Sequence, residues 1–151
     1  MFLSAFNEIQ SPPVRLVLTE INPGDGHALP FYYYDIFDAG NEAVGKISIR
    51  IENNADSYYN GHIGYEVNEP FRGHGYAYHT CRAILPVARV HGMALLYITC
   101  KAFNTASRKT IEKLCAAQGN NSGLDAIVDI PKTCFFWYDG IESYCIYKLL
   151  L

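Results

Sequence analysis

The sequence has no long apolar run, no surplus of basic residues and no recognisable export signal. Charged residues or glycines interrupt each apolar stretch well before the roughly 20 residues that a membrane-spanning helix needs, so we expect no membrane partner. The formal net charge of −3 argues against nucleic acid, which usually binds a basic face. Residues 1–10 lack the cationic start and apolar segment of a secretory signal, which predicts a cytoplasmic protein.

The sequence also lacks closely spaced cysteines and any internal repeat. Its five cysteines are an odd number and no two form a Cys-x-x-Cys pair, so we expect reduced, mostly buried thiols. A chain of 151 residues can bury about two-thirds of its unfolded surface in one core. We therefore expect a single domain over residues 1–151.

Strand patterns occur along most of the chain. Alternating or β-branched and aromatic stretches predict strands over residues 14–19, 31–37, 43–51, 62–67, 95–100, 126–130 and 144–150. The turn residues at 38–41 predict that the second and third of these strands form a hairpin.

Two stretches have helical spacing instead. Apolar residues from 77 to 88 recur at the helical period, and the pattern ends at His91-Gly92, where glycine can cap a helix. Pro86 lies inside this helix and should kink it. A second helix is predicted over 105–117, with Asn104 as its N-cap. The order of elements indicates an α/β sandwich with a mixed sheet.

The most informative segment is residues 64–77, which read GYEVNEPFRGHGYA. A strand is followed by a glycine-rich loop and the start of a helix, so unpaired backbone N–H groups should meet the positive end of the helix dipole. Glycine lets a phosphate approach these groups without a Cβ in the way. The pattern predicts a pyrophosphate site.

The loop differs from the two common nucleotide-binding patterns. It contains no Gly-Lys-Ser/Thr, which a P-loop needs to hold a terminal phosphate and magnesium. Gly73 and Gly75 are followed by Tyr78 where the dinucleotide pattern requires a third glycine. A site for ATP or NAD is therefore the weaker alternative.

Residues 72–77, RGHGYA, match the Arg/Gln-x-x-Gly-x-Gly/Ala signature, and the sequence resembles the GNAT superfamily of acyl-CoA N-acyltransferases there. IGYEVNEPFRGHGYA, followed about thirty residues later by NTASRKTIEKL, is similar to the branch that includes the ribosomal-protein N-terminal alanine acetyltransferases. The resemblance implies an α/β fold whose mixed, mostly antiparallel central sheet is flanked by helices. It also implies acetyl-CoA as the cofactor.

The resemblance also implies which residues hold coenzyme A. The strand that ends at Val67 would pair with the pantetheine arm, and Asn104 and Ser107 would lie beside it. Asn104 alternatively serves only as a helix cap, and His74 only as a loop residue. Backbone N–H groups would hold the pyrophosphate at Arg72, Gly73, His74, Gly75, Tyr76 and Ala77.

Acyl transfer needs a neutral amine, a donor for the developing oxyanion and a proton for the leaving thiolate. The N–H of Val67 is the candidate donor, as the resemblance implies. Glu66 is the candidate base, with pairing to a surface cation as the alternative of equal weight. His62 shares its strand face by the period of two and could relay protons, although a solvated histidine is the simpler interpretation.

The general acid is harder to assign. Ile111 stands where many members of the superfamily carry a tyrosine, and Thr99 stands where they carry a glutamate. Tyr138, Tyr144 and Tyr147 are candidate replacements, of which we select Tyr144, although a packing role is the commoner one for tyrosine.

The acceptor is expected to be a small-molecule amine or a protein N-terminus. Residues 20–30 are too short and too rich in Pro and Gly for the helices that relatives place there, so the acceptor pocket should be open or completed by a second subunit in a homodimer. Aromatic residues at 31–34 and 58–59 could line it with Asp35 or Glu66, or could pack on the sheet instead. A catalytically silent acyl-CoA-binding sensor is the alternative function.

Overall fold

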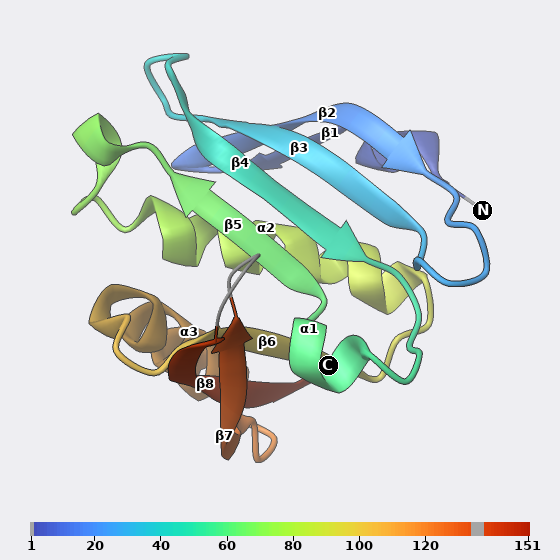
Figure 1. The fold of residues 1–151 in the computed structure, drawn as a ribbon. Coiled ribbons are helices and arrows are strands. Elements are labelled where there is room, and N and C mark those ends of the chain that lie inside the picture. Colours follow the sequence, from blue (N-terminus) through green and yellow to red (C-terminus); the bar gives the residue numbers. More distant parts are fainter. Residues whose placement is uncertain (1, 134–137) are drawn as a thin grey trace.

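The computed structural model describes residues 2–133 and 138–151, which form two antiparallel sheets with helices packed against them (Figure 1). The larger sheet has the order β1-β2-β3-β4-β5 and the smaller one the order β6-β8-β7. The strands are β1 (Glu8–Ser11), β2 (Val14–Asn22), β3 (Phe31–Phe37), β4 (Ala43–Arg50), β5 (Ile63–Val67), β6 (Leu95–Lys101), β7 (Gly123–Thr133) and β8 (Tyr138–Leu150). The predicted α/β fold is confirmed, with its sheet divided in two.

Strand alternation separates a buried face of the larger sheet from an outer face. In β3, Tyr32, Tyr34 and Ile36 are fully buried, whereas Tyr33 and Asp35 between them are half-buried. The buried side chains pack against α2 (Tyr76–Val90), which lies behind this sheet in Figure 1. The long helix α2 therefore covers one face of the sheet, and the outer face is bordered by α1 at its end.

The remaining helices are shorter or belong to the smaller sheet. The helix α3 (Thr105–Gln118) packs on β6, β7 and β8, and α1 (Ser57–Asn60) lies against β6. Two 3-10 turns span Ser4–Phe6 and Glu69–Phe71. None of the helices in the described ranges is long and apolar enough to cross a membrane.

The two sheets meet at one point and then separate. The His62 N–H donates to the Tyr97 carbonyl at 2.7 Å, and the Tyr97 N–H donates to His62 Nδ1 at 2.9 Å. Beyond this contact β5 has β4 as a neighbour on one side only, because it is the last strand of its sheet. Its other edge therefore has no partner strand among residues 2–133 and 138–151.

Several predicted boundaries differ from the observed ones. The strand β1 was not predicted; it pairs with β2 around Pro12-Pro13, whose peptide bond is cis. The first long helix continues through Pro86 but begins at Tyr76, because Gly73 and Gly75 have positive φ angles. Three of the four described cysteines are buried, as predicted, and Cys100 is half-buried.

His62 is a structural residue, and its assignment as a solvated strand residue or proton relay is wrong. It precedes β5 and is fully buried, whereas Glu66 is exposed. Because the Tyr97 N–H can only donate, His62 Nδ1 accepts and Nε2 carries the proton that bonds to the Glu52 carbonyl at 3.0 Å. Both ring nitrogens are therefore occupied.

Acid should destabilise the fold through His62. Burial lowers the pKa of His62 below its ordinary value, so the unfolded chain binds this proton more readily than the folded one. The stability that depends on the neutral ring is then lost as the pH falls below about 6.5, by at most about 1.4 kcal/mol per pH unit. We expect urea unfolding between pH 7 and pH 5 to show this loss.

A His62→Gln variant should show a flatter pH dependence of unfolding than the wild type. It should also be less stable at pH 7, by about 1–3 kcal/mol, because a buried hydrogen bond is lost. Burial lowers the pKa of His79 and His91 as well, so a smaller slope should remain. An unchanged slope would show that His62 is protonated to the same extent in both states.

Candidate active site

A groove of about 550 Å³ lies where β5, the loop before α2 and the start of α3 meet. Most of the residues that the sequence predicts for cofactor binding line it together, although the two motifs are about thirty residues apart. The lining residues are Tyr65, Glu66, Val67, Phe71, Arg72, Gly73, Gly75, Tyr76, Ala77, Asn104, Ala106, Ser107 and Thr110.

The glycine loop presents unpaired donors to this groove. Gly73 has a φ angle of 88° and Gly75 one of 76°, which turn the chain into α2 without a side-chain cap. No hydrogen bond within the described part of the chain uses the backbone N–H groups of residues 73–77. A Cβ added to Gly73 would meet no atom within 4 Å, so the space above the loop is open. These features suit an anion such as a pyrophosphate.

Arg72 adds a positive charge at the same place. Its side chain is exposed and turns back so that Nε donates to the Val67 carbonyl at 2.9 Å. The remaining guanidinium nitrogens form no hydrogen bond or ion pair with the described residues, and Arg72 lines the groove. The arginine thus joins the end of β5 to the loop and supplies charge for a phosphate group.

The free edge of β5 points two backbone N–H groups toward the groove. The Arg50 N–H bonds to the His62 carbonyl and the Asn68 N–H bonds to the Val44 carbonyl, both at 2.8 Å. Hydrogen-bonded pairs alternate along an antiparallel ladder, so every second residue between these two faces β4. Tyr65 and Val67 are the residues that face the other way, toward the groove.

The opposite wall comes from α3. Asn104 caps this helix, because its Oδ1 accepts from the Ser107 N–H at 3.2 Å, and it also lines the groove. The Tyr65 hydroxyl donates to Ser107 Oγ at 3.2 Å and so spans the gap between β5 and α3. Tyr65 was not predicted as a site residue, although its strand face, shared with Ile63 and Val67, could have indicated it.

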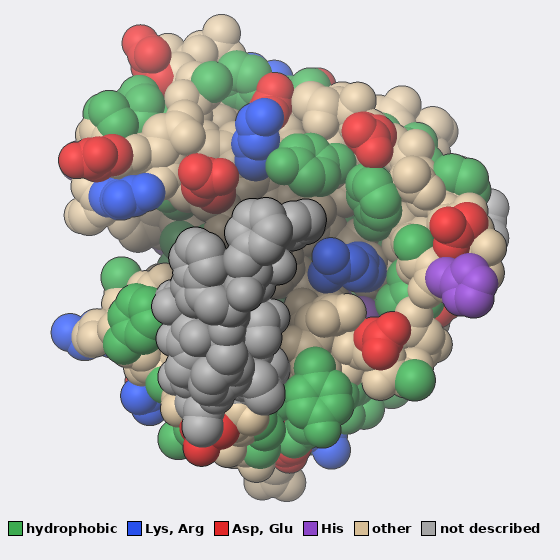
Figure 2. All heavy atoms as spheres, viewed as in Figure 1, with side chains coloured by type: hydrophobic (Ala, Val, Ile, Leu, Met, Phe, Trp, Pro, Cys, Tyr) green, Lys and Arg blue, Asp and Glu red, His purple; other side chains and the backbone are tan. Residues whose placement is uncertain are grey.

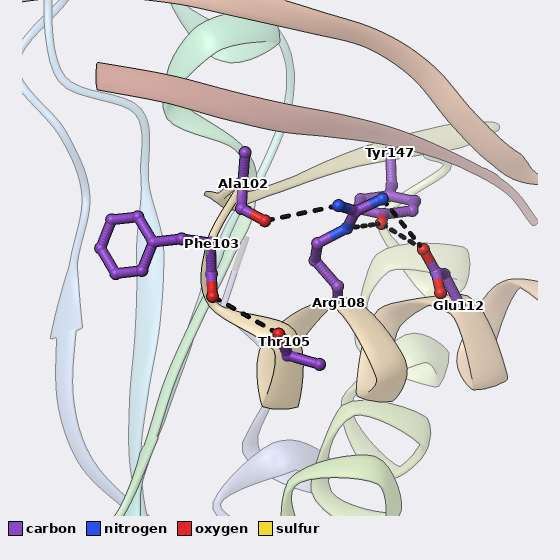
Figure 3. Close-up of polar contacts among 6 residues, drawn as sticks. All are labelled: Ala102, Phe103, Thr105, Arg108, Glu112 and Tyr147. Atoms are coloured by element: carbon purple, nitrogen blue, oxygen red, sulfur yellow. Dashed lines mark hydrogen bonds and ion pairs between the residues drawn. The ribbon is translucent and has the colours of Figure 1, made fainter. Parts of the chain in front are cut away.

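A polar network holds the start of α3 in position (Figure 3). Arg108 lies 3.4 Å from both the Ala102 carbonyl and the Tyr147 hydroxyl, and 3.8 Å from Glu112. Tyr147 in turn donates to Glu112 at 2.7 Å and is fully buried. These contacts tie α3 to β8 and to the loop that carries Asn104.

The family model for an acetyltransferase (GNAT) domain matches residues 15–115, about two-thirds of the chain. The chain belongs to the GNAT acetyltransferase family. The membership predicted from the sequence is thereby confirmed, and with it acetyl-CoA as the cofactor and N-acetyl transfer as the class of reaction. The matched range includes the glycine loop, the free edge of β5 and the start of α3.

Solved structures of GNAT acetyltransferases are similar to this chain in fold. RimL, the ribosomal L7/L12 α-N-protein acetyltransferase, is 22% identical with a TM-score of 0.59, over 80% of this chain and 69% of that one. MccE, the microcin C7 self-immunity acetyltransferase in complex with acetyl-CoA and AMP, is 17% identical with a TM-score of 0.59. That match covers 80% of this chain and 61% of MccE. No curated protein matches the chain.

A third similar structure comes from an enzyme with a different acceptor. The spermidine N-acetyltransferase of Vibrio cholerae, in complex with CoA and spermine, is 12% identical with a TM-score of 0.57. The match covers 80% of this chain and 65% of that one. At such identities the likeness shows the GNAT fold and leaves the acceptor open.

Three residues predicted for the site lie at its border or outside it. Glu66 is exposed on the outer face of β5, opposite Lys46, and borders the groove. His74 is exposed beside Tyr76 and does not line the groove, as expected of a loop residue. Tyr144 also lies outside it: its hydroxyl donates to Glu142 at 2.8 Å, and this bond raises its pKa.

Neither the buried Ile111 nor Tyr147 supplies an acid to the groove. Ile111, where many relatives carry a tyrosine, is fully buried in the core. Tyr147 is occupied by Glu112, and the side chain of Tyr138 lies outside the described residues. Among the residues that line the groove, Tyr65 has a hydroxyl that bridges its two walls.

Proposed function

We propose that this chain transfers the acetyl group of acetyl-CoA to a primary amine by direct attack. The observation that supports it is the continuity of the groove, which runs from the open loop at Gly73 to the free edge of β5. Bound acetyl-CoA supplies an acetyl group activated as a thioester. The chain provides the donors that hold it and the groups that move protons.

The order of donors follows from the position of the loop. The backbone N–H groups of residues 73–77 hold the pyrophosphate, and Asn104 and Ser107 border the arm from α3. The Arg72 N–H, a donor predicted from the sequence, bonds instead to the Glu69 carbonyl at 3.2 Å. Val67 is the edge residue nearest the loop, so its N–H pairs with pantetheine. The N–H of Tyr65 lies two residues, about 7 Å, further along the strand and stabilises the negative charge on the thioester oxygen. From the sequence alone, Val67 was the candidate for this second role.

Two side chains move protons. Glu66 accepts the proton that the amine loses, directly or through water, because its carboxylate is exposed on the face from which an acceptor can enter. Tyr65 donates to the sulfur as the carbon–sulfur bond breaks, because its hydroxyl lies inside the groove. Burial raises the pKa of Tyr65, so the hydroxyl keeps its proton at physiological pH.

A Tyr65→Phe variant should lower kcat by about 10- to 100-fold, at the lower end of general-acid effects. The factor should be constant between pH 6 and pH 9, because the raised pKa keeps the hydroxyl protonated over this range. Tyr144→Phe is the matched control and should keep its turnover. Reduced turnover in Tyr144→Phe with full turnover in Tyr65→Phe would return the role to Tyr144.

Cofactor class can be tested by thermal shift with acetyl-CoA, NAD and ATP. A ligand at 100 times its dissociation constant stabilises the fold by about 2.7 kcal/mol. We expect acetyl-CoA to raise Tm, whereas a shift with only NAD or ATP would contradict the proposal.

Thiol release with a panel of amines then separates the enzyme from a silent sensor, which the buried Ile111 would favour. Full turnover of Glu66→Gln at every pH would remove Glu66 as the base.

A further inference from the structure

A second cavity of about 370 Å³ lies on the outer face of the larger sheet. Its walls come from the segment between β2 and β3, from the outer faces of β3 and β4, and from α1 and the residues beside it. The lining residues are His27, Ala28, Leu29, Phe31, Tyr33, Ser48, Arg50, Asn54, Asp56, Ser57, Asn60 and Gly61. Figure 2 shows a basic side chain within a hollow on this face.

Turn chemistry builds one wall of this cavity. The Asp25 carboxylate accepts from the N–H groups of His27 and Ala28, and these bonds lower its pKa. Asn54 donates to the His27 carbonyl at 3.1 Å and holds the turn against the start of α1. A single chain thus forms the walls of a cavity that remains open to solvent, at the end of the sheet where the sequence predicted an open pocket or one completed by a second subunit.

The aromatic lining is narrower than predicted. Phe31 and Tyr33 line the cavity, but Tyr32 and Tyr34 are buried in the core on the other face of β3. Tyr58 does not line it, because its hydroxyl bonds to Asp125 at 2.5 Å. The aromatic part of the cavity lining therefore consists of the rings of Phe31 and Tyr33, among polar side chains.

The cavity lies beside the part of β5 where the reaction would occur. Ser48, which lines the cavity, is opposite Gly64 in the register of β4 and β5. Lys46, two residues before Ser48 and on the same face of β4, is opposite Glu66. A Cβ on Gly64 would approach no described atom closer than Ser48 Oγ, at 3.5 Å, so the outer face of β5 is uncovered here. An acceptor in the cavity can therefore reach the edge of β5 across Gly64.

Arg50 gives the cavity its chemical preference. One guanidinium nitrogen, Nη1, donates to the Gly61 carbonyl at 3.1 Å, which orients the side chain. Arg50 forms no ion pair with any carboxylate in the described part of the chain. Of the described residues that line the cavity, Asp56 alone is acidic, and His27 also lines this space. An oriented guanidinium with free donors matches a carboxylate.

From this juxtaposition we infer that the acceptor is a small primary amine that carries a carboxylate, which Arg50 binds. Arg50 lies two residues, about 7 Å, along β4 from Ser48, which is opposite Gly64, and this spacing sets the scale for the separation of the carboxylate and the amine. A chain of four or five carbons between them fits this distance. The inference rests on the proposed function, because the amine must meet an acetyl thioester at β5.

The test compares three amines of equal chain length, 5-aminopentanoate, pentylamine and 1,5-diaminopentane. Their binding is measured by calorimetry on the whole chain, both free and loaded with coenzyme A. We expect 5-aminopentanoate to bind about 10- to 100-fold more tightly than pentylamine, as for one charge-assisted pair. Arg50→Gln should abolish this difference. Arg89→Gln, an exposed arginine of α2 outside both cavities, should retain it.

Equal binding of the three amines, tightest binding of the diamine, or an unchanged preference in Arg50→Gln would overturn the inference. Circular dichroism and the acetyl-CoA thermal shift of Arg50→Gln check that the variant is folded and that its cofactor groove is intact. Failure of the proposed function has a different signature, since acetyl-CoA then gives no shift in the wild type. The preference for 5-aminopentanoate in the free chain would still report on Arg50 in that case.

Discussion

Replacing Gly73 with alanine is expected to weaken acetyl-CoA binding by about 10- to 100-fold. The added Cβ would enter the open space above the loop, where a phosphate must approach the unpaired N–H groups. Loss of one charge-assisted hydrogen bond accounts for this factor, at about 1.5–3 kcal/mol. Calorimetric titration with acetyl-CoA measures it directly.

The chain offers a closely matched control for this variant. Gly92, after the end of α2, has a φ angle of 80°, against 88° at Gly73, and an added Cβ would likewise meet no atom within 4 Å. Each alanine should therefore strain the folded backbone and lower the free energy of unfolding by a similar amount, about 1–2 kcal/mol. Gly92→Ala should bind acetyl-CoA with wild-type affinity. If both variants lost affinity equally, the effect would come from strain and the loop would not be the pyrophosphate site.

Gly45→Ala should disrupt both the stability of the fold and its turnover. A Cβ at Gly45 would lie 2.0 Å from the Glu66 carbonyl oxygen and 3.0 Å from the Val67 Cα, and neither is a flexible side-chain atom. The end of β5 would have to move away from β4, at a cost of about 3 kcal/mol, the upper end of common overpacking effects. Urea unfolding should show this loss.

The same displacement should remove the aligned donors of β5, so acetyl transfer should fall by at least about tenfold in the fraction that remains folded. Gly123→Ala is the control, because a Cβ at this position in β7 would meet nothing within 4 Å. It should change the free energy of unfolding by less than about 0.5 kcal/mol. Wild-type stability in Gly45→Ala would mean that β5 tolerates the shift and that its position is not what aligns the groove.

Features that depend on adjacent residues were predictable. Alternation identified β3 and β4 and their hairpin, and helical spacing identified α2 and α3 to within a few residues. The cradle between β5 and α2 was also predictable, because the freedom of Gly73 and Gly75 to adopt positive φ is a property of glycine itself. Asn104 as a cap follows in the same way from its side chain and the next turn.

Features that depend on distant residues were not predictable. The strand β1 has only four residues, too few for a clear alternation, and it forms because it can pair with β2. A period of two placed His62 with Glu66, but His62 precedes β5 and docks on Tyr97 of the other sheet. The reach of the Tyr65 hydroxyl to Ser107 joins residues 42 positions apart, which no local pattern contains.

By itself, then, the sequence determined that a strand, a glycine loop and a helix follow one another with donors free for an anion, since these are local backbone preferences. The tertiary structure decided that β5 has an edge free of other described strands, that Tyr65 and not Tyr144 enters the groove, and that Arg50 bonds to Gly61 in the second cavity. The physical reason is that each of these depends on which distant strands pair and which side chains the core can bury, and those choices minimise the free energy of the whole chain together.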